Sequence, residues 1–114
     1  MTKLKSPVDI ETAFATYKLI ELLGEGGAGR VYGGVDSDGS SIAVKVLTSG
    51  GNEKRRRFKN ETYFLLRNRH QNIVTVLDHG IAASADIKGP FYVIPVRLNI
   101  DTRPVPGANG PDAI

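Results

Sequence analysis

Six glycines fall within thirteen residues in the segment LLGEGGAGRVYGG (22–34), and this cluster constrains the fold more than any other feature. Glycine has no Cβ, so its backbone can approach another group closely. Apolar and β-branched residues flank the cluster on both sides, as is typical of strands. We therefore expect a strand over 17–26 that runs into a glycine turn. A hairpin over 31–47 should follow, with DSDGS (36–40) as its turn.

Two phosphate-binding motifs share the glycine spacing but do not fit the residues that follow it. Gly24 and Gly29 have the Walker A spacing, but Arg30 and Val31 stand where Lys-Ser/Thr is required. Gly24, Gly26 and Gly29 match the Rossmann G-x-G-x-x-G pattern, but that pattern must open a helix, and here a hairpin follows. The remaining alternatives are a glycine flap that lies over a nucleotide and a flexible hairpin loop with no ligand.

A helix is the next element. Asn52 can cap a helix that starts at Glu53 and ends near residues 68–70. Glu53 and Arg57 form a supportive i,i+4 pair. Residues at helical spacing predict one buried face, formed by Phe58, Thr62, Leu65 and Leu66.

Two more strands are expected over 72–80 and 89–96, joined by a loop over 81–90. The predicted fold is therefore α+β, with a five-stranded, mainly antiparallel sheet and one packed helix over residues 17–96. Residues 1–16 are expected to be an N-terminal extension with a short helical turn at 9–15. Residues 97–114 contain three of the six prolines and no periodic pattern, so we expect an extended or disordered tail.

Composition excludes several classes of function. The chain has 114 residues, enough for one small domain, and its 40% hydrophobic and 24% charged residues are typical of a soluble protein. It has no cysteines, so disulfides and thiolate metal sites are excluded. No apolar run approaches the ~18 residues that span a bilayer, and the N-terminus does not resemble a signal peptide. We therefore expect a cytoplasmic protein without a membrane partner.

The sequence also gives little support for a metal site or a nucleic-acid site. His70 and His79 have no carboxylate pair or cysteine nearby, so no metal site is expected. Residues 53–70 carry seven Lys/Arg against two Glu, enough for a nucleic-acid patch. We do not assign the aromatic residues of this segment to base stacking, and a basic solvent face explains the pattern as well. We expect no nucleic-acid partner.

Taken together and in order, these segments resemble the N-terminal lobe of the protein kinase superfamily. Leu23-Gly24-x-Gly26-x-x-Gly29-x-Val31 matches the Gly-rich loop, and Ala43-Val44-Lys45 matches the strand that carries the family's lysine. Glu61 stands where the helix glutamate is expected, and HQN (70–72) resembles the motif that follows this helix. The Gly-Glu-Gly-Gly run is similar to bacterial-type serine/threonine kinases.

The resemblance implies a nucleotide site and a role for each matched residue. The Gly-rich loop would cover the phosphates of ATP, Lys45 would contact the α- and β-phosphates, and Glu61 would hold Lys45 in place. In the adenine pocket, Val31 and Ala43 would form an apolar roof, and the start of the hinge would contact the base. Together the implied nucleotide-binding residues are Leu23, Gly24, Gly26, Gly27, Gly29, Val31, Ala43, Lys45, Ile94 at the gatekeeper position and Pro95 first in the hinge. The loop tip carries Ala28 where the family often has an aromatic residue.

The resemblance also shows what these residues do not supply. The sequence contains no His-Arg-Asp, Asp-Phe-Gly or Ala-Pro-Glu motif, which in the family provide the catalytic base and the magnesium ligands. We therefore expect a truncated kinase lobe that is inactive by itself and binds ATP weakly. Magnesium would be bound only in the complete parent kinase, whose activity would be phosphorylation of protein Ser/Thr. Apolar surface exposed on the lobe would invite protein partners, and a non-catalytic binding or regulatory module is the alternative function.

Overall fold

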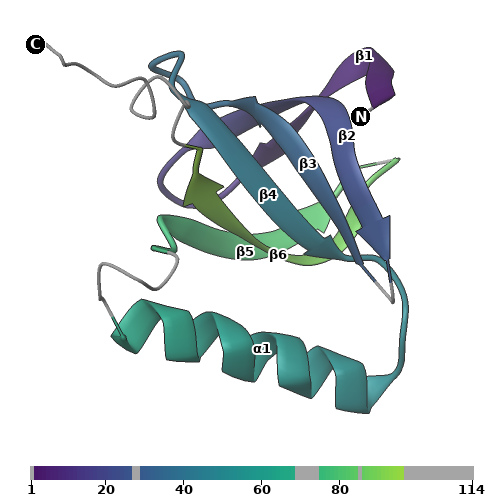
Figure 1. Ribbon diagram of the computed structural model, residues 1–114, viewed down its shortest axis with the longest axis vertical. Coiled ribbons are helices and arrows are strands. Elements are labelled where there is room, and N and C mark those ends of the chain that lie inside the picture. Colours follow the sequence, from purple (N-terminus) through teal and green to yellow (C-terminus); the bar gives the residue numbers. More distant parts are fainter. Residues whose placement is uncertain (1, 27–28, 69–74, 85, 97–114) are drawn as a thin grey trace, which may run out of the picture.

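The structure is a computed structural model that describes residues 2–26, 29–68, 75–84 and 86–96. Within these residues six strands form one antiparallel sheet in the order β1-β2-β3-β4-β6-β5. The sheet is strongly curled, and one helix lies beneath it (Figure 1). The elements are β1 (Thr2–Glu11), β2 (Thr16–Gly26), β3 (Gly29–Val35), β4 (Ser41–Leu47), α1 (Asn52–Arg67), β5 (Asp78–Ala83) and β6 (Lys88–Pro95).

The kinase-lobe type of fold is confirmed, but the expected five strands become six because the N-terminal residues join the sheet. Val8–Glu11 pair with Thr16–Leu19 of β2, so these residues form a strand instead of the helical turn expected at 9–15. Val8 and Ile10 alternate with polar residues and turn their side chains into the core, where Ile10 is almost fully buried. The alternation of apolar and polar residues therefore predicts the structure of this segment better than its helical pattern does.

The glycine hairpin and the hairpin that follows it form as expected. Gly26 pairs with Gly29 at the tip of β2 and β3, and β3 and β4 are paired along their whole length. The turn between β3 and β4 is closed by the Asp36 carboxylate, which accepts hydrogen bonds from the backbone N–H groups of Asp38 and Ser40, both 2.9 Å long. Gly39 has a φ of 84°, which glycine adopts without steric cost.

Helix α1 begins one residue earlier than expected and has a different cap. Gly51 occupies the N-cap position with an extended backbone, and its carbonyl accepts the N–H of Arg55 at 3.1 Å. Asn52 is therefore the first helical residue and not the cap. The helix ends at Arg67, one residue before the expected range of 68–70, and Asn68 is its C-cap. The backbone N–H and the side-chain amide of Asn68 both donate to the Phe64 carbonyl.

The expected boundaries of the last two strands are wrong. Residues 75–77 are not in a strand, and residues 72–74 lie outside the described part of the chain. The expected loop over 81–90 is mostly strand, since β5 extends to Ala83 and β6 begins at Lys88. Ser84 and Ile87 close the short connection through reciprocal hydrogen bonds. The expected disordered tail, residues 97–114, also lies outside the described residues.

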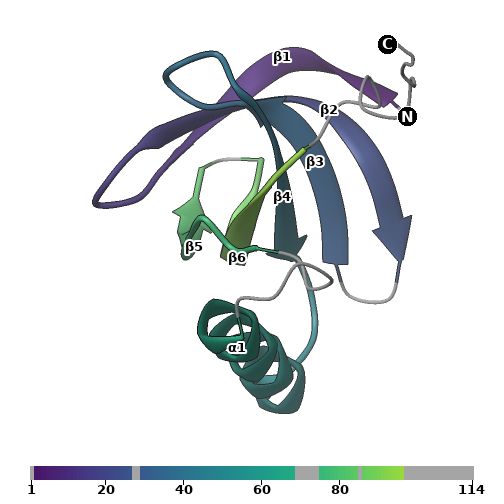
Figure 2. The same cartoon turned by 60° about the vertical axis from the view of Figure 1, so that its left-hand side comes forward.

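Two apolar clusters lie on opposite faces of the sheet. Figure 2 shows the curl of the sheet, with α1 below it. The larger cluster fills the inside of the curl. The smaller cluster packs the helix against the sheet and contains Leu47, Phe58, Val76 and Tyr92, with Leu65, Leu66 and Ile94 at its edge. The predicted apolar face of the helix is therefore confirmed, and it faces the same side of the sheet as Lys45.

A buried carboxylate joins the two ends of the curled sheet. Asp78 at the start of β5 accepts hydrogen bonds from the hydroxyls of Thr12, at 2.6 Å, and Tyr17, at 2.7 Å. Burial and the neighbouring Asp78 raise the pKa of Tyr17 well above its usual value, so the phenol stays a proton donor. The network ties the β1–β2 turn to β5 and holds the curl closed.

Candidate functional site

A groove of about 670 Å³ separates the glycine hairpin from the N-terminal half of the helix, and we call it the hairpin groove. Strands β2, β3 and β4 form one wall, and α1 forms the other. The residues that line it are Gly24, Glu25, Gly26, Gly29, Val31, Lys45, Leu47, Lys54, Arg57, Phe58 and Glu61.

Sheet register directs Lys45 into this groove. Lys45 of β4 is paired with Val31 on one side and with Tyr92 on the other, so all three side chains leave the same face of the sheet. Ala43 lies two residues before Lys45 in β4, so its side chain leaves the same face. The lysine therefore points toward the helix instead of into the curled interior.

An ion pair links the two walls of the groove. The Lys45 ammonium lies 3.5 Å from a carboxylate oxygen of Glu61, and the two side chains are 39% and 43% exposed. A pair with this much solvent contributes little to the stability of the fold. Its effect is to orient the ammonium, because the helix carboxylate restricts a flexible four-carbon stem.

Tyr92 lies next to Lys45 and was not among the expected site residues; it packs in the smaller apolar cluster and is not one of the residues that line the groove. Its ring centre lies 6.0 Å from the Lys45 ammonium. Burial, and secondarily the negative charge of Glu61, raise the pKa of Tyr92 to about 12. Tyr92 precedes Ile94 by two residues in β6, so the strand period could have placed it on this face.

Packing within the chain explains the glycine at position 29 of the hairpin but not the glycines at positions 24 and 26. A Cβ at Gly29 would lie 2.9 Å from the Val46 carbonyl oxygen, so packing within the chain requires glycine there. A Cβ at Gly24 or Gly26 would meet nothing within 4 Å, and neither has a positive φ. Because both line the groove, their missing side chains leave its roof open to a bound group.

The structure brings together only some of the expected nucleotide-binding residues. Gly24, Gly26, Gly29, Val31 and Lys45 line the hairpin groove with Glu61. Gly27 lies outside the described residues.

The other expected residues lie farther along the same sheet or beside it. Ala43 is paired with Gly33 and with Ile94, which extends the lysine's face toward the end of β6. The side chain of Leu23 covers Gly33, since a Cβ there would be 3.2 Å from the leucine Cδ1. Pro95 is paired with Ile42 at the last rung of β4 and β6.

The helix supplies cations that the sequence analysis did not assign to this groove. Lys54, Arg57, Phe58 and Glu61 are spaced i, i+3, i+4 and i+7, so they share one face of α1. The sequence shows this helical spacing. It does not show which face of the helix packs beside the glycine hairpin.

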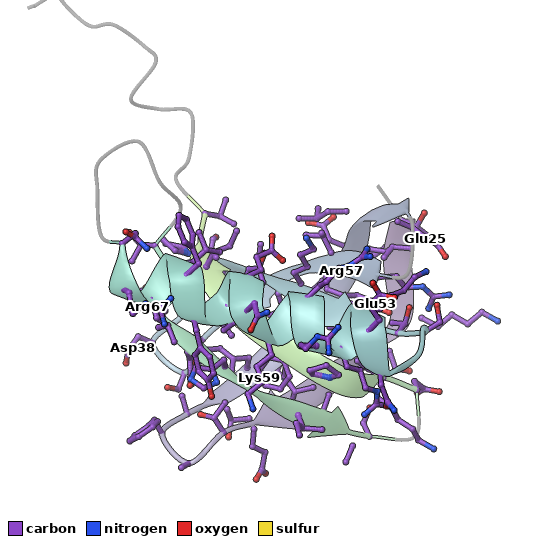
Figure 3. All side chains as sticks on the ribbon, turned by 90° about the horizontal axis from the view of Figure 1, so that it is seen from below. Glu25, Asp38, Glu53, Arg57, Lys59 and Arg67 are labelled. Atoms are coloured by element: carbon purple, nitrogen blue, oxygen red, sulfur yellow. The ribbon has the colours of Figure 1, made fainter. Side chains whose placement is uncertain are left out.

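Local ion pairs hold the charged side chains at the mouth of the groove. Arg57 is bound to Glu53 at 2.7 Å, and Glu25 is bound to Arg30 across the hairpin at 3.2 Å. Figure 3 shows Glu25, Glu53 and Arg57 at the same end of α1. The hairpin groove therefore has mixed charge, with cations and carboxylates on both of its walls.

The described residues contain neither a candidate metal-ligand cluster nor a helix that could span a membrane. Among them, no three His, Asp or Glu side chains gather in a way that could hold a metal ion. In the same ranges, the helix is too short and too polar to cross a membrane. His79 lies on β5, and His70 is outside the described part of the chain.

Known proteins are similar to this chain in sequence. The family model for protein tyrosine and serine/threonine kinases matches residues 17–94, which include the glycine hairpin, Lys45, Glu61 and Ile94. Similar proteins from Arabidopsis thaliana include a G-type lectin S-receptor-like serine/threonine-protein kinase, 36% identical over 82% of this chain, and a proline-rich receptor-like protein kinase, 48% identical over 74%. A cysteine-rich receptor-like protein kinase is 40% identical over 63%.

The match covers a small part of those proteins. The chain spans only 11–13% of the length of these curated relatives, so their complete activities are not shown for it. The family model, in contrast, matches well over half of this chain and includes both walls of the groove. The chain therefore belongs to the protein tyrosine and serine/threonine kinase family.

Proposed function

We propose that this chain is the nucleotide-binding half of a serine/threonine protein kinase domain and that ATP binds in the hairpin groove. One observation carries the proposal: the Lys45 ammonium is held 3.5 Å from Glu61 in a groove roofed by Gly24 and Gly26. Neither glycine is required by packing or by backbone conformation. An oriented cation beneath an open backbone roof suits a polyphosphate anion.

The residues that would hold ATP divide into two groups. Gly24, Gly26, Gly27 and Gly29 would cover the phosphates, and Lys45 would contact them. The apolar residues of the same sheet face and the start of the hinge would contact the adenine; they are Leu23, Val31, Ala43, Ile94 and Pro95. ATP would supply the transferable phosphoryl group, and Glu61 would act on it only through Lys45, as a positioning residue.

These residues do not by themselves complete a catalytic site. Phosphoryl transfer requires a residue that positions the acceptor hydroxyl and ligands for magnesium, and the matching motifs do not occur in these 114 residues. We therefore expect the chain alone to bind ATP weakly and to transfer nothing. Transfer to protein Ser/Thr, with magnesium, would belong to a complete kinase domain.

Several narrower assignments remain part of this proposal. We place the nucleotide-binding lobe at residues 17–96, with 1–16 as an extension and 97–114 as a segment unrelated to the family. We propose a cytoplasmic location for the lobe and no nucleic-acid or membrane partner. The bacterial subtype rests on the Gly-Glu-Gly-Gly run, and the plant relatives do not support it.

The second candidate function is a non-catalytic binding module with the same fold. Large apolar side chains exposed among the described residues, such as Phe14 and Ile81, favour it, because such surface can bind a protein partner. Both candidates predict no phosphoryl transfer by the chain alone. They differ in whether nucleotide binds.

Thermal melts of the 114-residue chain with and without magnesium-ATP test this proposal. ATP at a concentration near its Kd should raise the Tm by about 2–3 °C. Lys45→Met should abolish this shift, while the matched control Lys18→Met, an exposed residue on β2, should keep it. A shift of equal size in Lys45→Met would remove Lys45 from the site, and no shift in the wild type would favour the non-catalytic module. Transfer of radiolabelled phosphate above background would overturn the expected inactivity.

A further inference from the structure

Tyr92 of β6 carries a buried hydroxyl group. The residue is 5% exposed, and its ring packs against Phe58 of α1, with 5.3 Å between the two ring centres. Among the residues that the structure describes, none forms a hydrogen bond with this hydroxyl. Buried polar groups are nearly always hydrogen-bonded, because an unmade bond costs free energy. The hydroxyl of Tyr92 therefore needs a physical reason.

The Tyr92 side chain lies beside the Lys45–Glu61 ion pair. Tyr92 and Lys45 are directly opposite each other on β6 and β4, so their side chains leave the same face of the sheet. The Lys45 ammonium lies 6.0 Å from the centre of the Tyr92 ring and 3.5 Å from a Glu61 carboxylate oxygen. Burial, and after it the negative charge of Glu61, raises the pKa of Tyr92 to about 12. The phenol is therefore a proton donor at neutral pH, with a carboxylate nearby.

The Glu61 carboxylate can accept from a second donor. Its Oε1 contacts Lys45, and within the described ranges its Oε2 has no hydrogen bond or ion pair. The Glu61 side chain is 43% exposed, so a single contact leaves the carboxylate free to turn. The other buried hydroxyl of α1 belongs to Thr62, and it already donates to the Phe58 carbonyl at 2.9 Å. Tyr92 is the buried donor that remains for Glu61.

We propose that Tyr92 is a positioning residue of the nucleotide site: when ATP draws the Lys45 ammonium toward its phosphates, the Tyr92 hydroxyl donates a hydrogen bond to Glu61 and keeps that carboxylate directed at Lys45. This role rests on the function proposed above, because it requires that Lys45 binds the phosphates. Tyr92 would act only through Glu61 and Lys45, since it is not among the residues that line the hairpin groove. A donor on a packed strand suits this role, because it restricts the carboxylate without moving itself.

Attraction between the Tyr92 ring and the Lys45 ammonium is a weaker explanation for this tyrosine. A distance of 6.0 Å is at the limit at which a ring face attracts a cation effectively. Phenylalanine would offer the same ring without the cost of burying a hydroxyl. The two explanations make opposite predictions for Tyr92→Phe, which removes the hydroxyl and keeps the ring.

Thermal melts of the complete 114-residue chain test the role of the hydroxyl. The apparent Kd is taken from the rise in Tm over a series of magnesium-ATP concentrations. Without nucleotide, Tyr92→Phe should melt within about 2 °C of the wild type, because the hydroxyl it removes has no partner among the described residues. Its affinity for ATP should fall about fivefold, because Lys45 is held less well. Its affinity for adenosine, measured in the same way, should not change, since adenosine has no phosphate for Lys45.

Two further variants separate this role from a general effect on packing. Tyr32→Phe is the matched control, because Tyr32 is 3% exposed and lies in the larger apolar cluster on the other face of the sheet. It should change the affinity for ATP less than about twofold. In a Glu61→Ala background, Tyr92→Phe should cause no further loss of ATP affinity, because the hydroxyl acts through that carboxylate.

Three outcomes would overturn the role of Tyr92 while the wild type still binds ATP. An ATP affinity of Tyr92→Phe within about twofold of the wild type would show that the hydroxyl is not needed. Equal losses for ATP and adenosine would indicate disturbed packing. A further fivefold loss in the Glu61→Ala background would show that the hydroxyl acts on another group. These results leave the nucleotide proposal standing, whereas a wild type that does not respond to ATP would overturn both proposals.

Discussion

The two grooves on either side of α1 share Phe58 and differ in almost everything else. The hairpin groove has cations and carboxylates on both walls and a roof of glycine backbone. A second groove lies between α1 and strands β5 and β6, and it is lined by apolar side chains such as Tyr63 and Ile81 together with Arg55, Lys59 and His79. One helix produces both, because Lys54, Arg57 and Glu61 fall on one side of it, while Arg55, Lys59 and Thr62 fall on the other. A basic run that looks uniform in sequence is therefore divided between two sites of different chemistry.

Truncation of Phe58, the side chain that lines both grooves, should have the largest effect on the stability of the fold. Phe58 is 6% exposed, and its ring lies 5.3 Å from that of Tyr92. Phe58→Ala should lower the free energy of unfolding by about 3–5 kcal/mol, measured by urea denaturation, because it leaves a cavity between helix and sheet. The ATP-induced Tm shift proposed for the hairpin groove should be lost as well. Phe58→Leu is the control and should cost less, since it keeps most of the volume. An alanine variant of unchanged stability would show that the helix does not depend on this contact.

Alanine substitutions at Gly29 and Gly24 should distinguish a glycine that the stability of the fold requires from one that ATP binding requires. Gly29→Ala places a Cβ 2.9 Å from the Val46 carbonyl oxygen and should lower stability by about 1–3 kcal/mol. Gly24→Ala meets no neighbour, so stability should stay within about 1 kcal/mol of the wild type, while the ATP-induced Tm shift falls. Denaturation and ATP melts measure the two effects. A Gly24→Ala variant with an unchanged ATP shift would contradict the close approach of phosphate to that backbone.

Loss of the helix carboxylate should affect binding more than folding. Glu61→Gln removes a half-exposed ion pair, which should change the free energy of unfolding by less than about 1 kcal/mol. The same variant should bind ATP more weakly, because Lys45 loses the group that orients it. Glu53→Gln is the matched control, since it breaks the exposed pair with Arg57 on the same helix. Equal loss of ATP binding in both variants would attribute the effect to overall charge.

The smallest effect concerns Tyr92 at alkaline pH. The folded chain raises the pKa of Tyr92 from 10.0 to about 12, so the folded state keeps its proton where the unfolded state has lost it. The stability that this contributes is complete below pH 10 and is lost as the pH rises toward 12. Tyr92→Phe removes this loss and should unfold at a slightly higher alkaline pH, followed by circular dichroism. An unchanged alkaline midpoint would show that Tyr92 titrates as in the unfolded chain.

Much of the lobe was predictable because its signals are local. The glycine hairpin, the DSDGS turn and the apolar face of the helix depend on residues a few positions apart, and the structure confirms all three. The first strand was missed although Val8 and Ile10 alternate with polar residues, because a single edge strand leaves a short periodic pattern. The ends of β5 and β6 were misplaced because strand limits depend on the partner strand.

The sequence by itself determined the order of the elements from β2 onward, the glycine hairpin, and the glycines and lysine that line the hairpin groove. Only the tertiary structure decided that Lys45 meets Glu61, that Tyr92 lies beneath them, and that the basic helix faces two different grooves. The physical reason is that periodicity defines which residues share a face, while strand register and helix packing join residues distant in the chain. Those contacts become definite only when the whole curled sheet has formed around them.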